Sequence, residues 1–146
     1  MAATIDPRTR LEVLDREECL SLLRRHTVGR LAVVGDDRRP YVFPVNYALD
    51  GSAVVFRTDR GTKLHLADGR WVAFECDGID TLYHTGWSVL VSGVAEEVSN
   101  AAEVVRLSKL PLGGWCPGAH PRWVRIRSMG ISGRRIPPHG SNDESC

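Results

Sequence analysis

A short polar stretch near the middle of the chain combines the residue types that bind phosphate. Arg57 and Thr58 are followed by Gly61, Thr62 and Lys63, so these two cations, two hydroxyls and a glycine lie within seven residues, together with Asp59 and Arg60. Phosphate recognition needs fixed positive charge, hydroxyl donors and free backbone N–H groups, and this stretch supplies all three. It is not a P-loop, because the lysine of a P-loop precedes the Ser or Thr. A solvated polar loop is the alternative interpretation.

A proline lies in the predicted strand that precedes this stretch. Pro44 is followed by Val45 and Asn46 inside a β-rich run over residues 40–49. Because proline has no N–H to donate, its position favours a strand edge or an interrupted pairing, where exposed backbone could face a flat ring. Pro44 and Asn46 share one face of the strand, since side chains alternate. A simple bulge at Pro44 is the alternative.

Several familiar catalytic patterns are missing. The sequence has no G-x-G-x-x-G after a strand and no H-E-x-x-H. The run Gly86-Trp87-Ser88 begins like a nucleophile elbow, but Leu90 stands in place of the second glycine. Cys116 and His120 are two potential ligands on a loop rich in Gly and Pro, which is too few for a metal site. We therefore expect no metal, and any redox chemistry has to come from a bound organic cofactor.

Two helices are predicted from their end signals. Asp15 and Glu18 form a capping box, and basic residues at 24–26 place positive charge at the C-terminal turn of the helix that follows. Asn100 and Glu103 form a second capping box, and Pro111 ends that helix. Residues 64–67 predict one or two further helical turns.

The remaining pattern predicts strands. Six β-rich runs are separated by turn signals, at residues 31–34, 40–49, 53–58, 71–76, 86–98 and 123–127. Asp50-Gly51 predicts a hairpin turn, and Gly93 predicts a bend within the long fifth run. The sequence therefore predicts a mainly β fold with flanking helices, namely a six-stranded antiparallel β-barrel. We expect a single domain over residues 1–136 and a flexible tail over residues 137–146.

Composition excludes several classes of protein. The chain of 146 residues has 19 Lys and Arg against 18 Asp and Glu, a net charge of +1 that argues against nucleic-acid binding through bulk charge. No apolar run approaches the roughly 18 residues of a membrane span, and the N-terminal residues lack the apolar core of a signal peptide. The four cysteines are scattered along the chain, and we interpret them as free thiols in a reducing compartment. We expect a cytoplasmic protein.

An ordered set of short segments resembles a known superfamily. The segments are residues 15–23, Gly29-Arg30-Leu31-Ala32, residues 40–46, Val55-Phe56-Arg57-Thr58, Gly61-Thr62-Lys63-Leu64, Val72-Ala73-Phe74-Glu75, residues 86–93 and Trp123-Val124-Arg125-Ile126. Over roughly residues 12–136 this order is similar to the pyridoxamine 5′-phosphate oxidase-like superfamily, in particular its actinobacterial and nitroimidazole-resistance-like branches. The resemblance implies a split β-barrel that binds flavin mononucleotide (FMN).

The resemblance also implies a homodimer with FMN at the subunit interface. The residues that match the superfamily's phosphate contacts are Arg57, Thr58, Thr62 and Lys63. The residues that match the strand beneath the isoalloxazine ring are Pro44, Val45 and Asn46, and Asn46 is the side chain expected to hydrogen-bond the polar edge of the flavin. Ser88 matches a polar residue that reaches the flavin from the facing region, and Trp87 is expected to form a wall of the same pocket.

One departure from the superfamily bears on the reaction. Pyridoxamine phosphate oxidases carry an R-x-V-L-L-K stretch where this chain has residues 41–46, and their C-terminal substrate-phosphate contacts have no confident match here. We therefore expect an FMN-dependent oxidoreductase that passes a hydride to a small conjugated acceptor and does not oxidise pyridoxamine or pyridoxine phosphate. One alternative is a deazaflavin-dependent reductase. Another is a non-catalytic protein that stores or senses flavin or haem, with His65 or His84 as the axial ligand.

Overall fold

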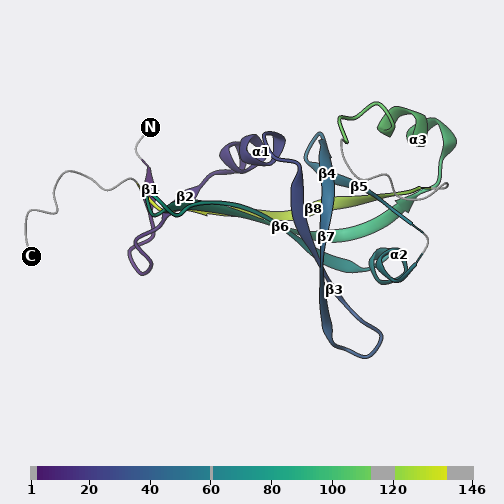
Figure 1. Ribbon diagram of the computed structural model, residues 1–146, viewed down its shortest axis with the longest axis horizontal. Helices are drawn as coiled ribbons and strands as arrows, with labels where there is room; N and C mark the ends of the chain where they lie inside the picture. Colours follow the sequence, from purple (N-terminus) through teal and green to yellow (C-terminus); the bar gives the residue numbers. More distant parts are fainter. Residues whose placement is uncertain (1–2, 60, 113–120, 138–146) are drawn as a thin grey trace, which may run out of the picture.

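The computed structural model describes residues 3–59, 61–112 and 121–137, and its strands form one antiparallel sheet that closes on itself (Figure 1). The strands are β1 (Thr4–Ile5), β2 (Glu12–Leu14), β3 (Val28–Val34), β4 (Pro40–Asp50), β5 (Ala53–Thr58), β6 (Trp71–Asp80), β7 (Thr85–Val98) and β8 (Arg122–Arg135). Their order is β1-β2-β8-β5-β4-β3-β6-β7, and a further β7–β8 pairing closes a barrel of the six strands β3 to β8. The predicted six-stranded antiparallel barrel is confirmed.

In the part of the chain that the structure describes, three helices flank the barrel: α1 (Arg16–Arg24), α2 (Thr62–Ala67) and α3 (Ala101–Leu107). Asp15 and Glu18 form the predicted reciprocal capping box at the start of α1, with N–O distances of 2.9 and 3.0 Å. At the start of α3 the Asn100 side chain accepts from the Glu103 N–H. None of the described helices is long and apolar enough to cross a membrane.

The predicted strands are present, and three of them, β3, β6 and β8, extend several residues beyond their sequence pattern. The strand expected over residues 123–127 continues to Arg135 because it pairs along almost the whole of β7. β1 and β2 were not predicted. They contain only two and three residues, and β2 is held by pairing with the end of β8, a partner far away in sequence. The bend expected at Gly93 coincides with a register shift between β7 and β8.

The barrel interior is filled by the inward-facing residues of every long strand. Leu31, Tyr47, Phe56 and Phe74 have exposed fractions of 1% or less. The rings of Tyr47 and Phe74 meet edge to face, with centroids 4.8 Å apart. Gly29 on β3 makes room for them, because a Cβ at this position would collide with the Phe74 ring. Burial of each of these large side chains contributes about 1.5–3 kcal/mol to the free energy of unfolding.

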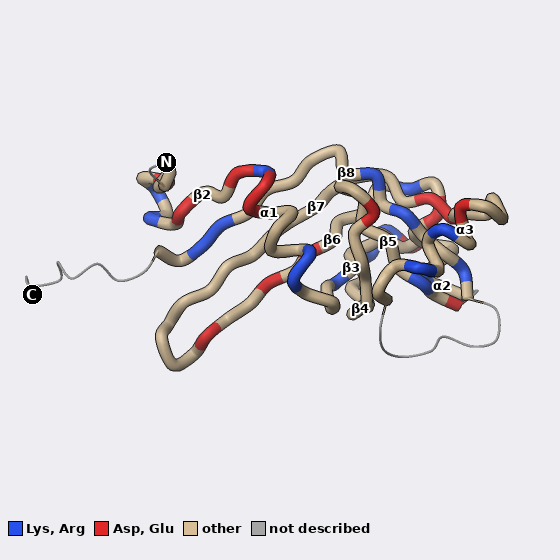
Figure 2. Tube along the Cα trace, turned by 90° about the horizontal axis from the view of Figure 1, so that it is seen from above, with Lys and Arg blue, Asp and Glu red and all other residues tan. Residues whose placement is uncertain are grey.

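Charged residues of both signs are interspersed along the described trace (Figure 2). Many of them pair across elements. Arg106 on α3 contacts Asp50 at the end of β4 at 2.8 Å, and Arg125 on β8 contacts Glu103 on α3 at 3.0 Å. These pairs fix α3 against the end of the barrel where β4, β5 and β8 lie side by side. Residues 138–146 of the predicted tail lie outside the described residues.

Candidate functional site

Strand β4 changes its partner halfway along, and this change creates a pocket. Residues 40–46 pair with β3, whereas residues 47–50 pair with β5. The β4–β5 ladder ends at the pair Tyr47–Phe56, and the last two residues of β5, Arg57 and Thr58, pair only with β8. The two strands therefore separate beyond this point. A cavity of about 610 Å³ lies in the opening.

The open edge of β4 presents backbone polar groups to this cavity. The Tyr47 N–H donates to the Thr27 carbonyl on the β3 side at 2.9 Å. Because backbone groups alternate between the two edges of a strand, the Pro44 carbonyl and the Asn46 N–H point to the opposite edge, at and beyond the end of the β4–β5 ladder. Pro44 thus lacks an N–H at a position where no neighbouring strand needs one. The predicted strand edge at Pro44 is confirmed, since its only ladder partner is Arg30.

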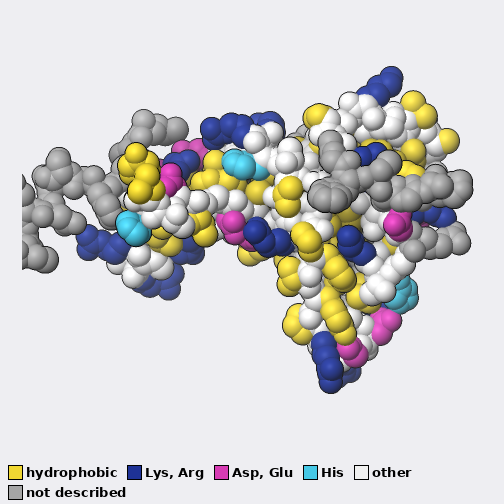
Figure 3. All heavy atoms as spheres, viewed as in Figure 1, with side chains coloured by type: hydrophobic (Ala, Val, Ile, Leu, Met, Phe, Trp, Pro, Cys, Tyr) yellow, Lys and Arg dark blue, Asp and Glu magenta, His cyan; other side chains and the backbone are white. Residues whose placement is uncertain are grey.

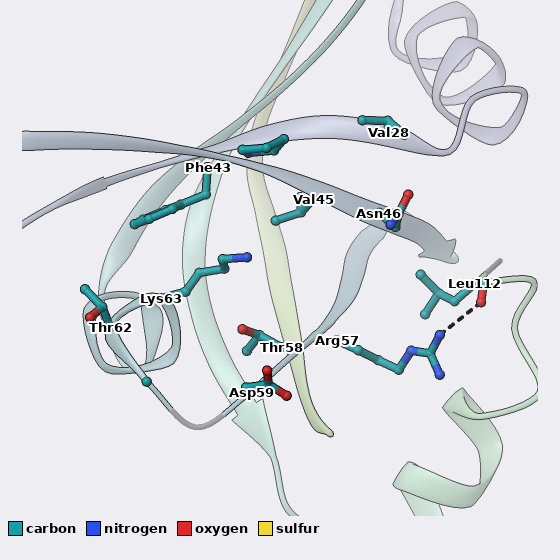
Figure 4. A pocket seen from close by; sticks show the side chains of 12 residues that line it. Val28, Phe43, Val45, Asn46, Arg57, Thr58, Asp59, Thr62, Lys63 and Leu112 are labelled. Atoms are coloured by element: carbon teal, nitrogen blue, oxygen red, sulfur yellow. Dashed lines mark hydrogen bonds between the residues drawn. The ribbon is translucent and has the colours of Figure 1, made fainter. Parts of the chain in front are cut away.

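Seven of the nine residues predicted to contact the cofactor line this single cavity (Figure 4). They come from β4, from the end of β5 and from the start of α2, and they are Pro44, Val45, Asn46, Arg57, Thr58, Thr62 and Lys63. The structure therefore brings the strand that contains Pro44 together with the polar stretch of residues 57–63. Their role in holding a flavin stays a prediction.

The two cations among the described residues of the pocket are held differently. The Arg57 guanidinium donates to the Leu112 carbonyl at 3.1 Å and lies 5.5 Å from the centre of the Trp123 ring. These contacts fix it at one end of the cavity. The Lys63 ammonium lies 5.6 Å from the centre of the Phe43 ring and extends across the cavity (Figure 4). The Lys63 side chain can thus reorient to contact a bound anion, whereas the Arg57 guanidinium supplies positive charge at a fixed position.

Sequence reasoning missed several residues of the pocket. Phe43 shares the inward face of β4 with Val45, which the alternation of side chains could have shown. Asp59 follows Thr58 directly and places a carboxylate among the cations and hydroxyls. Val28 and Leu112 come from distant parts of the chain, and no local sequence signal indicates that they line the cavity.

Trp87 and Ser88 lie outside this cavity within the same chain. They are on β7, where they pair with Gly78 and Asp77 of β6. The Trp87 ring packs against the His26 ring, with centroids 4.6 Å apart, and lines a different cavity beside the β6–β7 hairpin. Ser88 is exposed on the outer face of the sheet. The structure therefore does not join these two residues to the other seven.

The two histidines considered as axial haem ligands, His65 and His84, also lie away from the pocket. The His65 Nε2 is 2.9 Å from the Asp36 carboxylate, which lies on the β3–β4 hairpin. His84 lies in the β6–β7 turn with a φ of 51°. Neither histidine is among the described residues that line the pocket. Cys116 and His120, considered as metal ligands, fall outside the described residues.

A charged group lies on the outer face of the sheet next to the pocket. Arg30 on β3, the ladder partner of Pro44, contacts Glu75 at 3.2 Å and Asp77 at 3.4 Å. Both carboxylates project outward from β6, one strand further from the pocket. Partial burial, together with the neighbouring Asp77 carboxylate, raises the pKa of Glu75 to about 6.

The barrel and its lateral opening define a split β-barrel protein. The family model described as pyridoxamine 5′-phosphate oxidase matches residues 15–135, and the chain therefore belongs to this family. The resemblance read from the ordered sequence segments is confirmed.

Relatives and solved structures agree with this assignment. The chain is 36% identical over 129 residues to the uncharacterised protein Rv0080 of Mycobacterium tuberculosis, covering 84% of each chain. It is 36% identical to the structure of the FAD-binding protein from Mycobacterium smegmatis, covering 88% of this chain and 99% of that one, with a TM-score of 0.77. It is 26% identical to a FAD-binding protein from Mesorhizobium loti, covering 86% and 96%, with a TM-score of 0.74.

Proposed function

We propose that this protein is a flavin-dependent oxidoreductase that holds the FMN unit of its cofactor in the opening between β4 and β5. The observation that carries the proposal is the single cavity of about 610 Å³ lined by Arg57, Thr58, Thr62 and Lys63 together with Pro44, Val45 and Asn46. Its volume lies within the range of about 300–1,000 Å³ that small-molecule sites occupy. Family members with similar folds that bind FAD, from Mycobacterium smegmatis and Mesorhizobium loti, support a flavin.

The residues present fit a flavin phosphate at one end of the cavity. Lys63 and Arg57 supply two positive charges, and the hydroxyls of Thr58 and Thr62 can donate to phosphate oxygens. Thr58 is buried at the wall of the cavity. Lys63 rests over an aromatic ring and can move from it to a phosphate at little cost, because such a contact at an exposed site contributes about 0.5–1 kcal/mol.

The other end of the cavity fits a flat ring with a polar edge. The Pro44 carbonyl and the Asn46 N–H offer one acceptor and one donor on the edge of β4, and Phe43 and Val45 form an apolar wall. A bound flavin supplies hydride transfer, and the protein orients the ring and shapes the space over it. Among the described residues at this end of the cavity, Phe43, Pro44, Val45 and Asn46 carry no ionisable side chain, which favours hydride transfer to a quinone-like or nitroaromatic acceptor.

A second copy of the chain completes the site in this proposal. The outward face of β3, β4, β6 and β7 carries large exposed apolar side chains, including Val28, Val42, Trp71 and Leu90, with exposed fractions of 53%, 63%, 61% and 47%. Some of this apolar area is visible over β3 and β4 in Figure 3. Such a patch beside the cavity mouth suits a protein interface. A partner seated there would bring its own Trp87 and Ser88 toward the cofactor.

Titration of the apoprotein with FMN, followed by quenching of flavin fluorescence, tests the cofactor site. Lys63→Ala should weaken FMN binding by about 1.5–3 kcal/mol, the usual contribution of a charged hydrogen bond. Lys109→Ala, which removes an exposed lysine that follows α3, is the matched control and should bind FMN as the wild type does. Unchanged affinity in both Lys63→Ala and Arg57→Ala would remove these residues from the site.

Light scattering tests the dimer. The wild type should have twice the mass of the 16.2 kDa chain. Trp71→Glu places a charge in the apolar face and should give a folded monomer with weakened flavin binding, whereas Val105→Glu on α3 should leave the dimer intact. A wild-type monomer that binds flavin at full affinity would contradict the interface site.

Stopped-flow reoxidation tests the reaction. Reduced flavin bound to the protein should be reoxidised by quinones or nitroaromatics faster than free flavin, and pyridoxine 5′-phosphate should be oxidised slowly or not at all. The same traces with a reduced deazaflavin decide between the two cofactor classes. Efficient turnover of pyridoxine 5′-phosphate without acceleration for the other acceptors would contradict the proposed substrate class.

A further inference from the structure

The outward face of β3, β4, β6 and β7 holds a charged cluster formed by Arg30, Glu75 and Asp77. The nearest outward-facing neighbours of the cluster on these four strands are uncharged, namely Val28, Ala32, Val42, Pro44, Asn46, Ala73, Ser88, Leu90 and Ser92. Charged groups placed among uncharged ones fix the register of two partners across an interface. The cluster can therefore decide how a second copy of the chain sits on this face.

The strand registers arrange this face in rows that cross β4, β3, β6 and β7 in that order. One row contains Pro44, Arg30, Glu75 and Leu90. The next row contains Asn46, Val28, Asp77 and Ser88, in which Val28 and Asp77 continue the register of β3 with β6. The midpoint of both rows is the boundary between β3 and β6. Asn46 and Ser88 thus lie in one row and the same number of strands away from this boundary.

A two-fold axis along this boundary exchanges the two ends of each row. Two copies that pack face to face through the same surface have their axis in the plane of the interface. An axis parallel to the strands places Ser88 of the second copy opposite Asn46, as the proposed flavin site requires. An axis across the strands would place β4 on β4 of the second copy and leave Ser88 away from the cavity. The proposed site therefore selects the parallel axis.

The parallel axis also places Glu75 of the second copy opposite Arg30, and Arg30 of the second copy opposite Glu75. Within one chain the Arg30 Nη1 contacts both carboxylates of the cluster, and among the described residues no carboxylate contacts its Nε or Nη2. The N–H groups of these two nitrogens can donate to a second carboxylate. Glu75 accepts through Oε2 within the chain, so its Oε1 can accept from the second copy. Packed sheets lie about 10 Å apart, a distance that an arginine and a glutamate side chain span together.

Uncharged residues of the face pair in the same way. The axis places Ala32 opposite Ala73 of the second copy, and two such small side chains let the sheets approach each other. By continuation of the same register it places Val34, which is 57% exposed, opposite Trp71, which is 61% exposed. Burial of both side chains would remove apolar surface from water. The face is therefore complementary to itself in charge, in size and in polarity.

We infer that two copies of this chain pack face to face about a two-fold axis along the boundary of β3 and β6, with Arg30 of each copy bonded to Glu75 of the other. The inference rests on the proposed function, because it takes from it that a second copy covers the flavin cavity. It assigns to Arg30 and Glu75 the choice of the register in which Ser88 of one copy meets Asn46 of the other.

Light scattering of Arg30→Glu, of Glu75→Arg and of their equimolar mixture tests the inference at about pH 8, above the pKa of Glu75 of about 6. Each variant alone places like charges across the axis, so its dimer should be weakened at least about tenfold. In the mixture each substituted side chain faces an opposite charge in the other chain. A heterodimer of about twice the 16.2 kDa chain should therefore form and bind FMN. The pairs within each chain stay like-charged, so this recovery reports contacts between chains.

Arg16→Glu on α1, the same charge reversal at an exposed arginine, is the matched control and should dimerise as the wild type does. Circular dichroism checks that each variant is folded. If a charge-reversed variant does not fold, Glu75→Gln replaces it and should weaken the dimer several-fold.

Dimers of wild-type strength in either single charge-reversed variant or in Glu75→Gln would overturn the inference, as would a mixture of folded chains that stays monomeric. The flavin site would still stand in these cases, because FMN binding by the wild-type dimer is measured separately. A wild-type monomer would overturn the second copy at the flavin site and the inference together.

Discussion

The two halves of strand β4 have opposite roles although they belong to one continuous strand. Residues 40–46 pair with β3, and their edge toward β5 has no strand partner. Residues 47–50 pair with β5, and their edge toward β3 has no strand partner. In the second half the chain that follows α1 takes up the first group of the free edge, since the Tyr47 N–H donates to the Thr27 carbonyl at 2.9 Å, and the Tyr47 hydroxyl donates to the Leu23 carbonyl of α1 at 2.6 Å. In the first half no strand or helix covers the edge among the described residues, and the pocket lies there.

This difference shows how a barrel can keep both a core and a site. Each half of β4 leaves one row of backbone groups without a strand partner, and such groups have to be satisfied. The second half satisfies its first group within the chain, through the Tyr47 N–H and the Thr27 carbonyl. The first half offers the groups of Pro44 and Asn46 to a ligand. Substitutions in the second half should therefore change stability, and those in the first half should change binding.

The largest expected effect is on the covered half. Tyr47→Ala removes a side chain that is 1% exposed, packs on Phe74 and bonds to α1, and should lower the free energy of unfolding by about 3–5 kcal/mol. Val42→Ala in the open half is the comparison, made like Tyr47→Ala in the monomeric Trp71→Glu background, where Val42 is exposed and its truncation should change the free energy of unfolding by no more than about 0.5 kcal/mol. Denaturation with urea measures both. A similar loss in the two variants would remove the distinction between the halves.

A smaller effect is expected from Asn46 in the open half. Asn46→Ala should weaken flavin binding by about 0.5–1.5 kcal/mol, the net contribution of one hydrogen bond. Its free energy of unfolding should stay close to that of the wild type, because the side chain is only partly buried and lies on the outward face. Flavin titration and urea denaturation of the same preparation separate the two outcomes. A loss of stability without a loss of affinity would place Asn46 with the core rather than the site.

The smallest effect concerns pH and the charged group beside the open half. Because burial and Asp77 raise the pKa of Glu75 to about 6, the folded state favours protonated Glu75. The stability that this provides is complete below the ordinary glutamate pKa and is lost as the pH rises through about 6. We expect a loss of about 1 kcal/mol or less between pH 4.5 and 6.5, given the partial exposure of the group.

Glu75→Gln should flatten that part of the stability profile, measured by urea denaturation at a series of pH values. Glu17→Gln on α1, an exposed carboxylate, is the control and should keep the wild-type slope. A profile unchanged by Glu75→Gln would show that Arg30 holds Glu75 ionised throughout this range.

Local signals explain why most of the proposed site could be predicted. Pro44 indicated an unpaired edge because its missing N–H is a property of one residue, and the order of strand, polar loop and short helix brought Arg57 near Lys63 through adjacency in the chain. The same argument fails for Val28 and Leu112, which reach the pocket through pairing and packing with distant segments. It fails for Trp87 as well, since its distance from the pocket depends on how β7 runs around the barrel.

The sequence by itself determined the elements of this protein, because caps, turns and side-chain alternation act over a few residues. The capping box at Asp15, the hairpin at Gly51 and the strand edge at Pro44 are of this kind. Only the tertiary structure decided where β4 leaves β5 and that β1 and β2 extend the sheet. These features depend on the closure of β7 against β8, which joins segments far apart in the chain and leaves no local pattern in it.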